Sequence, residues 1–247
     1  MTDHLVVDPQ SWLDARRSLL AREEALMRLK KEVNEARMGL PWVKLETTYV
    51  FDTPAGRRSL GDLFDGRSQL LVYHFMFNPD WAAGCPGCSF MADTFDGALA
   101  HLRNHDVALV AASRAPLAKL EAYKARMGWR FPWVSSQHNT FSYDFGVSFR
   151  PEEVATGKVA YNYGLIDAEE GEDLPGLSVF HRDPDGEVFH TYSAYGPTLE
   201  DLISALAFLD RTPKGRNETS PLSFIRRHDE YENAPAASAC CSEIAAA

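Results

Sequence analysis

Two cysteines separated by two residues carry the clearest chemical signal in the sequence. Cys85 and Cys88 stand in the run 84–89, Gly-Cys-Pro-Gly-Cys-Ser, where a strand pattern gives way to a helix pattern. Unpaired backbone N–H groups and the helix dipole favour a thiolate at a helix start and lower the thiol pKa. We therefore expect Cys85 to be a nucleophile and Cys88 to attack a mixed disulfide formed there. Pro86 suits the first helical position, where its missing N–H costs no hydrogen bond.

The same spacing has other uses. A Cys-x-x-Cys pair also forms half of a structural zinc site, or occurs as two inert thiols. Four cysteines among 247 residues are too few for a disulfide scaffold. Cys240 and Cys241 are adjacent in an Ala-rich terminal stretch, and we interpret them as an incidental exposed pair. The alternatives for that pair are a ring disulfide, an electron relay to Cys85, or a soft-metal site.

Alternating strand and helix patterns surround the motif. The apolar run 70–77 predicts a buried parallel strand, and apolar residues at helical spacing follow it. The predicted core elements are a strand over 70–77, a helix over 90–103, a strand over 107–112, a helix over 116–127 and a strand within 129–135. This βαβαβ order implies right-handed crossovers and a largely parallel sheet centre. Alternation along the first strand places His74 opposite Tyr73, and we interpret His74 as a core histidine.

Further elements flank this core. An Asp8-Pro9 cap predicts a helix to about residue 38, followed by a turn-rich hairpin over 48–60. Residues 137–173 are interpreted as an insertion, with a strand indicated over 143–149. A second hairpin over 174–192 and a helix capped by Thr198 complete the domain. We predict an N-terminal extension (1–45), a main domain (46–211) and a C-terminal tail (212–247) with one ordered patch around 224–231.

The N-terminal helix carries a narrow apolar seam. Trp12, Leu19, Leu26 and Val33 recur at every seventh position. We favour packing of this seam on the chain's own domain, and a homodimer through the helix is the alternative.

The composition and net charge limit the kinds of partner and the compartment that we expect for this protein. Hydrophobic residues make up 45% of the chain, charged residues 24%, and the net charge is −10. That charge argues against nucleic acid and anionic membranes as partners. Neither a signal-peptide pattern nor an apolar run of about 20 residues is evident, so we expect a cytoplasmic protein. The histidines show no metal-ligand spacing, and we expect no metal and no cofactor.

The order of elements resembles the thioredoxin fold over about residues 70–210. The first hairpin is similar to the peroxiredoxin-type elaboration of that fold. Several motifs resemble the bacterial DUF899 family, namely those at 73–77, 84–90, 113–117, 128–136 and 174–180. The resemblance implies an α/β thioredoxin-like fold, a central mixed sheet flanked by helices.

The resemblance also assigns roles to residues. It implies that Cys85 is the nucleophile, Cys88 the resolving cysteine, and Pro175 the cis-proline that precedes the last hairpin. Substrate would then contact Pro175, Pro86 and Gly87, with Trp81 providing from the loop the flat apolar surface that residue 84 lacks.

The chain departs from the thioredoxin pattern at two positions. Gly84 stands where thioredoxins have tryptophan, and Tyr73 stands where they place a buried acid, so another group has to serve that acid's role. Arg114 and Arg130 are candidates for positive charge beside the thiolate, with ordinary solvation as the alternative.

These residues favour a thiol–disulfide oxidoreductase acting on a protein or small-molecule disulfide. One alternative is a redox-inert or metal-binding interaction module on the same scaffold. A thiol peroxidase is the other, although the Pro-x-x-x-Thr/Ser-x-x-Cys signature of peroxiredoxins is absent at both Cys85 and Cys88.

Overall fold

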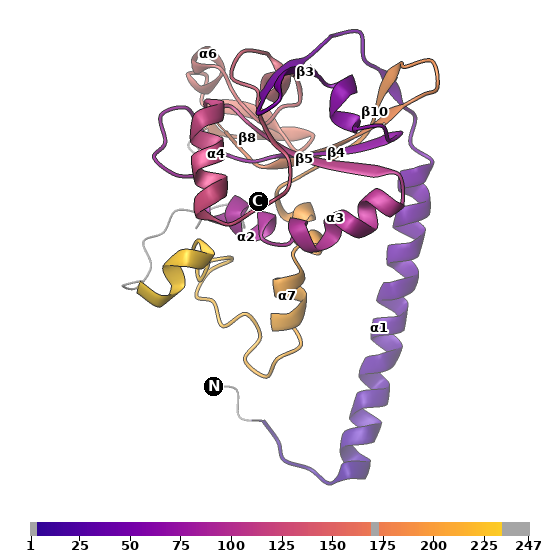
Figure 1. Ribbon diagram of the computed structural model, residues 1–247. Helices are drawn as coiled ribbons and strands as arrows, with labels where there is room; N and C mark the ends of the chain where they lie inside the picture. The colour runs from indigo at the N-terminus through magenta and orange to yellow at the C-terminus, as the bar shows by residue number, and fades with distance from the viewer. Residues whose placement is uncertain (1–3, 169–172, 234–247) are drawn as a thin grey trace. The chain divides into compact units, whose positions relative to one another are not determined.

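The computed structural model describes residues 4–168 and 173–233 and divides the chain into two compact units, with the boundary after Trp42 (Figure 1). The first unit consists mainly of helix α1, Pro9–Met38. The Asp8 carboxylate accepts hydrogen bonds from the backbone N–H groups of Gln10 and Ser11, and Gly39 follows the helix. The predicted helix and its cap are confirmed. Packing of its apolar seam on the chain's own domain stays a prediction, as does the alternative of dimerisation through it.

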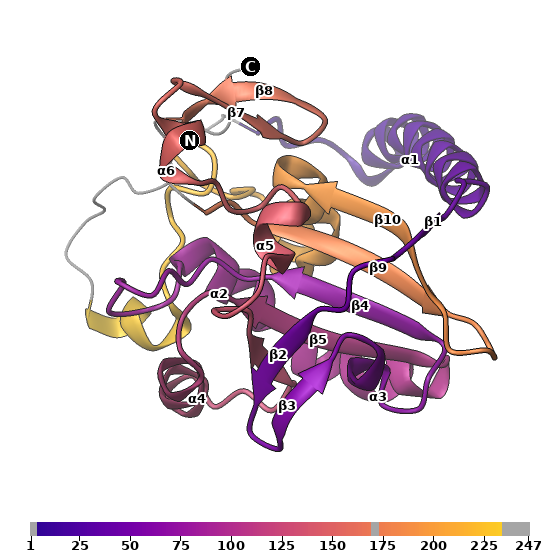
Figure 2. The same cartoon turned by 90° about the horizontal axis from the view of Figure 1, so that it is seen from above.

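An eight-stranded mixed sheet forms the centre of the second unit. Its order is β1-β10-β9-β4-β5-β6-β2-β3. The strands are β1 (Val43–Lys44), β2 (Val50–Thr53), β3 (Gly56–Ser59), β4 (Gln69–His74), β5 (Val107–Ser113), β6 (Trp133–Ser135), β9 (Gly176–Arg182) and β10 (Val188–Tyr195). Strands β4, β5 and β6 are parallel. On the other side of β4, β9 is antiparallel to β4, and β10 is antiparallel to β9. Figure 2 shows β10, β9, β4 and β5 side by side. This is the predicted α/β thioredoxin-like arrangement.

Each face of the sheet has its own core. Leu70 and Val72 pack with Phe51, Phe64 and other residues on one face. Tyr73 and Phe75 belong to the other core, which also contains Cys85 and Cys88. The helices against that second face are α2 (Pro86–Ala92), α3 (Phe95–Asn104) and α4 (Leu117–Arg126). Because side chains alternate along β4, residues 73 and 75 point toward the motif helix.

The single helix predicted over 90–103 is wrong, since the chain forms α2 and α3 with a break at Asp93 and Thr94. The Thr94 hydroxyl donates to the carbonyl of Met91 (2.7 Å), and the Asp93 carboxylate binds the Trp129 indole N–H (2.8 Å). These contacts hold the break between the two helices.

The predicted final helix also differs. Residues 196–202 form the 3₁₀-helix η3 (Gly196–Leu202), and α7 covers only Ser204–Leu209. The Thr198 hydroxyl donates to the Tyr195 carbonyl (2.7 Å), so it does not cap a helix by accepting a backbone N–H.

The insertion contains α5 (Phe141–Asp144), α6 (Pro151–Val154) and a small sheet of β7 (Lys158–Tyr161) and β8 (Gly164–Asp167). The strand predicted over 143–149 is wrong, because its alternating apolar residues lie in α5 and an irregular segment. Within that segment Ser148 forms an isolated antiparallel bridge with Asp173. Short 3₁₀-helices η1 (Gly61–Phe64) and η4 (His228–Asn233) complete the described elements.

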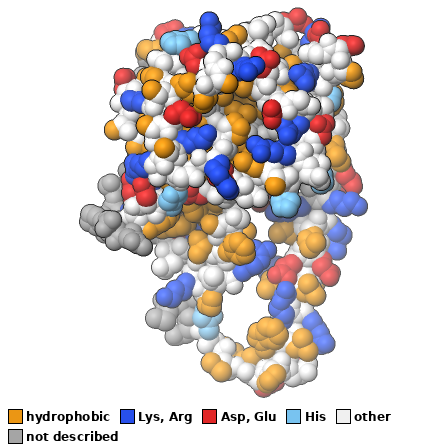
Figure 3. Space-filling model, viewed as in Figure 1, with side chains coloured by type: hydrophobic (Ala, Val, Ile, Leu, Met, Phe, Trp, Pro, Cys, Tyr) orange, Lys and Arg blue, Asp and Glu red, His pale blue; other side chains and the backbone are white. Residues whose placement is uncertain are grey.

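Basic and acidic side chains are interspersed on the visible face of the second unit (Figure 3). Among the helices of the described ranges, none has both the length and the apolar character to cross a membrane.

Candidate thiol site

The Cys-x-x-Cys motif lies where the chain passes from β4 to α2, as predicted. Cys85 is the N-cap residue of α2 and Pro86 occupies the first turn. The backbone N–H of Cys85 donates to the Met76 carbonyl (3.1 Å). The Cys85 carbonyl accepts from the Ser89 hydroxyl (2.8 Å) and from the Ser89 N–H (2.9 Å). These bonds fix the motif against the end of the central strand.

The two cysteines differ in access to solvent. Cys85 is 9% exposed and Cys88 only 2%. Both side chains are therefore buried, and Cys85 is the more accessible of the two. Pro86 and Gly87 are half-buried beside Cys85, and a Cβ at Gly87 would lie 3.9 Å from the Cys85 sulfur. Trp81 is more exposed, and its backbone carbonyl accepts a hydrogen bond from the Lys119 ammonium (2.9 Å).

Tyr73 lies beside both thiols. It belongs to the same buried core as Cys85 and Cys88. Burial, reinforced by interactions with Cys88 and Cys85, raises the pKa of Tyr73 well above its ordinary value. The Cys88 sulfur faces the backbone N–H of Met76, at 3.5 Å. The sequence placed Tyr73 in the core but did not reveal its interactions with the two cysteines.

Gly84 has no room for a side chain. A Cβ at this position would lie 2.6 Å from Phe75 Cε1 and 3.0 Å from Tyr123 Cε1. The rings of Phe75 and Tyr123 thus occupy the space that a side chain at residue 84 would need.

Pro175 lies at the start of β9, next to the end of β4. Gly176 pairs with His74, so Pro175 comes opposite the residue that follows the strand. The described residues contain no cis peptide bond, and the predicted cis geometry at Pro175 is wrong. The insertion sets the path of the chain here: the Leu174 N–H donates to the Val147 carbonyl (2.9 Å) and the Tyr161 hydroxyl donates to the Pro175 carbonyl (2.6 Å).

The segment 222–231 covers part of the motif, a contact that the sequence did not indicate. Arg227 donates two hydrogen bonds to the Gly84 carbonyl, from Nη2 at 2.7 Å and from Nε at 3.0 Å. The Phe224 ring packs edge-on against Phe90 of α2 (5.9 Å between centroids).

The predicted ordered patch near these residues is confirmed. The only sequence signal for it was its aromatic and charged residues within a stretch of small polar ones. Cys240 and Cys241 lie outside the described residues.

Replacing Arg227 by alanine is expected to raise the apparent pKa of the Cys85 thiol and to slow its alkylation at pH 7 about two- to fivefold. The guanidinium binds the carbonyl that precedes Cys85, and a nearby positive charge favours the thiolate. The measurement is iodoacetamide labelling of Cys85 as a function of pH. Any change in access alters the plateau rate, whereas the midpoint reports the charge.

Arg226→Ala is the matched control, because Arg226 binds carbonyls of its own segment, at Ser223 and Ile225. An unchanged midpoint in Arg227→Ala would show that this guanidinium does not act on the thiol.

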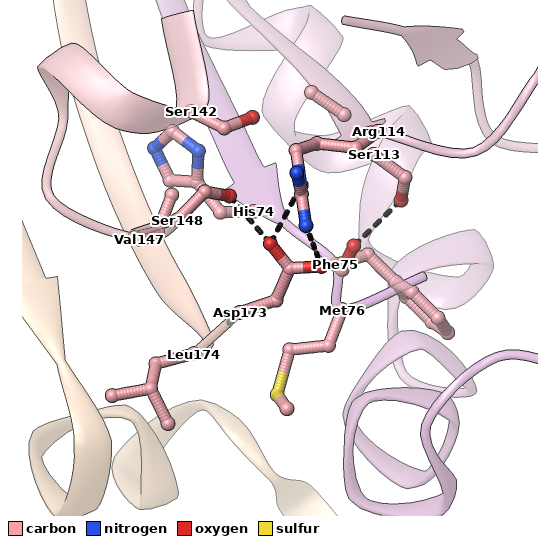
Figure 4. Close-up of a pocket in the computed structure, with 11 residues that line it drawn as sticks. His74, Phe75, Met76, Ser113, Arg114, Ser142, Val147, Ser148, Asp173 and Leu174 are labelled. Carbon is pink, nitrogen blue, oxygen red and sulfur yellow. Dashed lines mark hydrogen bonds and ion pairs between the residues drawn. The ribbon is translucent and has the colours of Figure 1, made fainter. Parts of the chain in front are cut away.

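A buried polar cluster lies at the carboxyl ends of β4 and β5, around a small cavity of about 10 Å³ (Figure 4). Arg114 Nε and Nη2 bind the two carboxylate oxygens of Asp173 at 2.8 and 3.2 Å. The Ser148 hydroxyl donates to the same carboxylate (2.6 Å), and Arg114 Nη1 donates to the Tyr143 hydroxyl (2.6 Å). Arg114 is therefore engaged in a structural ion pair.

The side chain of Arg130 is 82% exposed and lies beside Asp96, which agrees with the alternative prediction that this arginine is an ordinary solvated surface residue.

His74 is a buried core histidine, as predicted. Its ring stacks on Phe141 (5.2 Å between centroids), and its Nε2 lies 2.8 Å from the Ser178 hydroxyl. Ser178 is hydrogen-bonded to Ser193 (2.9 Å), which is in turn bonded to His190 Nε2 (2.8 Å). Burial lowers the pKa of His74 to about 3, with a smaller effect from His190.

Comparisons with solved structures give neighbours of low similarity. Peroxidoxin BcpB from Mycobacterium tuberculosis is 16% identical, with a TM-score of 0.44 over 69% of this chain and 97% of its own. A mutant of Xanthomonas campestris peroxiredoxin Q is 15% identical, with a TM-score of 0.46 over 69% and 97%. A mutant of Arenicola marina peroxiredoxin 6 is 15% identical, with a TM-score of 0.41 over 67% and 73%.

The sequence comparisons gave two results. No curated protein matches this chain. A family model described as "Bacterial protein of unknown function (DUF899)" matches residues 1–231.

Proposed function

Since the chain belongs to the DUF899 family, whose description names no activity, we propose from the site itself that it is a thiol–disulfide oxidoreductase with Cys85 and Cys88 as its redox pair. The observation that carries this proposal is the arrangement of the two thiols. Cys85 is at a helix start and, at 9% exposure, is the more accessible thiol, whereas Cys88, three residues later in the same helix, is 2% exposed. An attacking thiol needs access to substrate, whereas a resolving thiol needs only proximity to the first sulfur.

The reaction takes place in two exchanges. The Cys85 thiolate attacks one sulfur of a substrate disulfide, so that a Cys85–substrate disulfide forms and the other substrate sulfur leaves as a thiolate that takes up a proton. Cys88 then loses its proton and attacks the Cys85 sulfur. The second substrate sulfur leaves and is protonated, and a Cys85–Cys88 disulfide remains. Counted together with the proton that Cys85 releases to solvent when it becomes a thiolate, the pair loses two electrons and two protons, and the substrate gains the same number.

Several contacts suit this sequence of steps. The Met76 backbone binds both cysteines, since its carbonyl accepts from the Cys85 N–H and its N–H faces the Cys88 sulfur. Pro175 comes opposite the residue that follows the same strand. We propose that the substrate lies across Pro86 and Gly87 toward Pro175, with Trp81 at the outer margin.

The direct test is trapping in a Cys88→Ser variant. In a Cys240→Ser/Cys241→Ser background, reaction with a small aromatic disulfide such as 5,5′-dithiobis(2-nitrobenzoate) is expected to leave one stable adduct per chain at Cys85. The protein with both motif cysteines is expected to release the second chromophore and to retain an internal disulfide. Mass spectrometry before and after dithiothreitol treatment identifies the adduct, and Cys85→Ser is the control that forms none.

Three other results would contradict the proposal or assign one of the alternative functions. If Cys88→Ser forms no adduct and both thiols alkylate with ordinary pKa values of about 8.5, the proposal fails. Stoichiometric zinc that is lost in Cys85→Ala would assign a metal-binding module instead. Within the described part of the chain, no group of three or more His, Cys, Asp or Glu residues is arranged to hold a metal. Sulfenic acid that forms at Cys85 only with peroxide would assign a thiol peroxidase.

A further inference from the structure

Side chains of segment 222–231 and of the insertion bind main-chain groups that a polypeptide substrate would use. We infer that the substrate is a small-molecule disulfide, and that segment 222–231 is a cover that keeps the disulfides of proteins away from Cys85. This inference rests on the proposed function and narrows its substrate to one chemical class. The reaction is the same: the dithiol of Cys85 and Cys88 becomes a disulfide, and the small disulfide becomes two thiols.

The cover is anchored directly next to the nucleophile. Arg227 donates two hydrogen bonds, of 2.7 and 3.0 Å, to the carbonyl of Gly84, the residue before Cys85. On α2, the Phe224 ring lies edge-on against Phe90 (5.9 Å between centroids). The cover therefore contacts both the loop that precedes Cys85 and the helix that follows it. Cys85 itself is 9% exposed, so the access to it is narrow.

Charged contacts hold the other end of the cover. Arg126, at the end of α4, binds the carboxylates of Asp229 (2.7 and 3.0 Å) and Glu230 (2.9 Å). The His228 ring binds the Asp93 carboxylate (2.7 Å) at the break between α2 and α3. The Arg126 side chain is 39% exposed and its two acidic partners are 31% and 34% exposed. Ion pairs with this exposure are weak individually, so the cover opens at a modest cost in free energy.

The main chain before β9 also has internal partners. An extended polypeptide binds beside a strand mainly through main-chain hydrogen bonds. The Pro175 carbonyl accepts from the Tyr161 hydroxyl (2.6 Å), and the Leu174 N–H donates to the Val147 carbonyl (2.9 Å). The insertion thus already occupies the groups with which a substrate peptide would pair there.

The loop before the motif is engaged in the same way. The Lys119 ammonium binds the carbonyls of Pro79 (2.5 Å) and Trp81 (2.9 Å). Together with Arg227 on Gly84, two basic side chains of this chain bind three carbonyls of the loop. A small disulfide needs none of these main-chain groups, because it has only to bring one sulfur atom to the nucleophile.

The test compares two disulfides of different size. Reduced protein in the Cys240→Ser/Cys241→Ser background is mixed with 2-hydroxyethyl disulfide or with insulin. Formation of the Cys85–Cys88 disulfide is followed by acid quenching, alkylation and mass spectrometry, and each rate is divided by the rate of dithiothreitol with the same disulfide. We expect the normalised rate with 2-hydroxyethyl disulfide to exceed that with insulin about 100-fold, because insulin reacts only with the small fraction of molecules whose cover is open.

Releasing the cover should remove this selection. Arg126→Ala/Phe224→Ala deletes two of its anchors and should raise the rate with insulin at least about tenfold, while the rate with 2-hydroxyethyl disulfide changes less than about twofold. Arg226→Ala is the matched control, since Arg226 binds carbonyls of its own segment, and it should leave both rates unchanged. If the double variant fails to fold, Asp229→Asn/Glu230→Gln removes the charges that Arg126 binds and should change the ratio in the same direction.

Equal normalised rates for the two disulfides in the parent protein would overturn the inference. A ratio that stays the same in the variants with a released cover would also overturn it. Neither result affects trapping at Cys85 in Cys88→Ser, whereas loss of that trapping would remove the proposed function itself. The two failures are therefore distinguishable.

Discussion

Replacement of Asp173 by alanine is expected to lower the free energy of unfolding by about 3–5 kcal/mol. The Arg114 guanidinium and the Asp173 carboxylate are 13% and 6% exposed, and they are joined by two hydrogen bonds of 2.8 and 3.2 Å. Without the carboxylate, a buried positive charge loses its counterion and the Ser148 hydroxyl loses its acceptor. Chemical denaturation monitored by circular dichroism measures the loss.

Two comparisons test the cause. Asp167→Ala removes the exposed ion pair with Lys158 and should change the free energy of unfolding by less than about 1 kcal/mol. Asp173→Ala combined with Arg114→Met should cost much less than Asp173→Ala alone, because no unpaired charge then remains. Equal destabilisation in the single and double variants would show that the charge of Arg114 is not responsible.

The protein is expected to lose stability in mild acid because of His74. Burial lowers the pKa of this side chain from 6.5 to about 3, so the folded state keeps it neutral where the unfolded state binds a proton. Its contribution is fully present above pH 6.5 and is lost as the pH falls toward 3. The slope is about 1.4 kcal/mol per pH unit, which gives about 2 kcal/mol between pH 6.5 and 5.

A His74→Gln variant checks this assignment, since glutamine retains a hydrogen-bonding group near Ser178 but does not titrate. Its free energy of unfolding should fall less steeply between pH 6.5 and 5 than that of the parent protein. His190, which reaches His74 through two serines, also has a pKa lowered by burial and acts in the same direction. The residual slope in His74→Gln should therefore disappear largely on a further His190→Gln substitution. Parallel curves for the parent and His74→Gln would contradict the prediction.

Local patterns were sufficient to predict the centre of the fold. The apolar run that forms β4 and the turn residues of the motif placed Cys85 at a helix start. Alternation also separated His74 from Tyr73, so the two sides of the sheet were assigned correctly.

Contacts between distant parts of the chain account for what was missed. Arg114 and Asp173 are 59 positions apart, and nothing in either neighbourhood indicates their pairing. The break between α2 and α3 involves Asp93, which binds Trp129 and His228 from remote segments. The route of the insertion sets the backbone around Pro175, and Arg227 reaches Gly84 across 143 positions. Periodicity and turn propensity report local preferences and contain no information on such pairs.

The crowding at Gly84 has a consequence for how this motif can change by design or in evolution. The Phe75 ring already fills the volume that a side chain at residue 84 would occupy. Transplanting the tryptophan of thioredoxins into this loop alone would force two rings into one space. A viable exchange must therefore shrink the side chain at residue 75 in the same step.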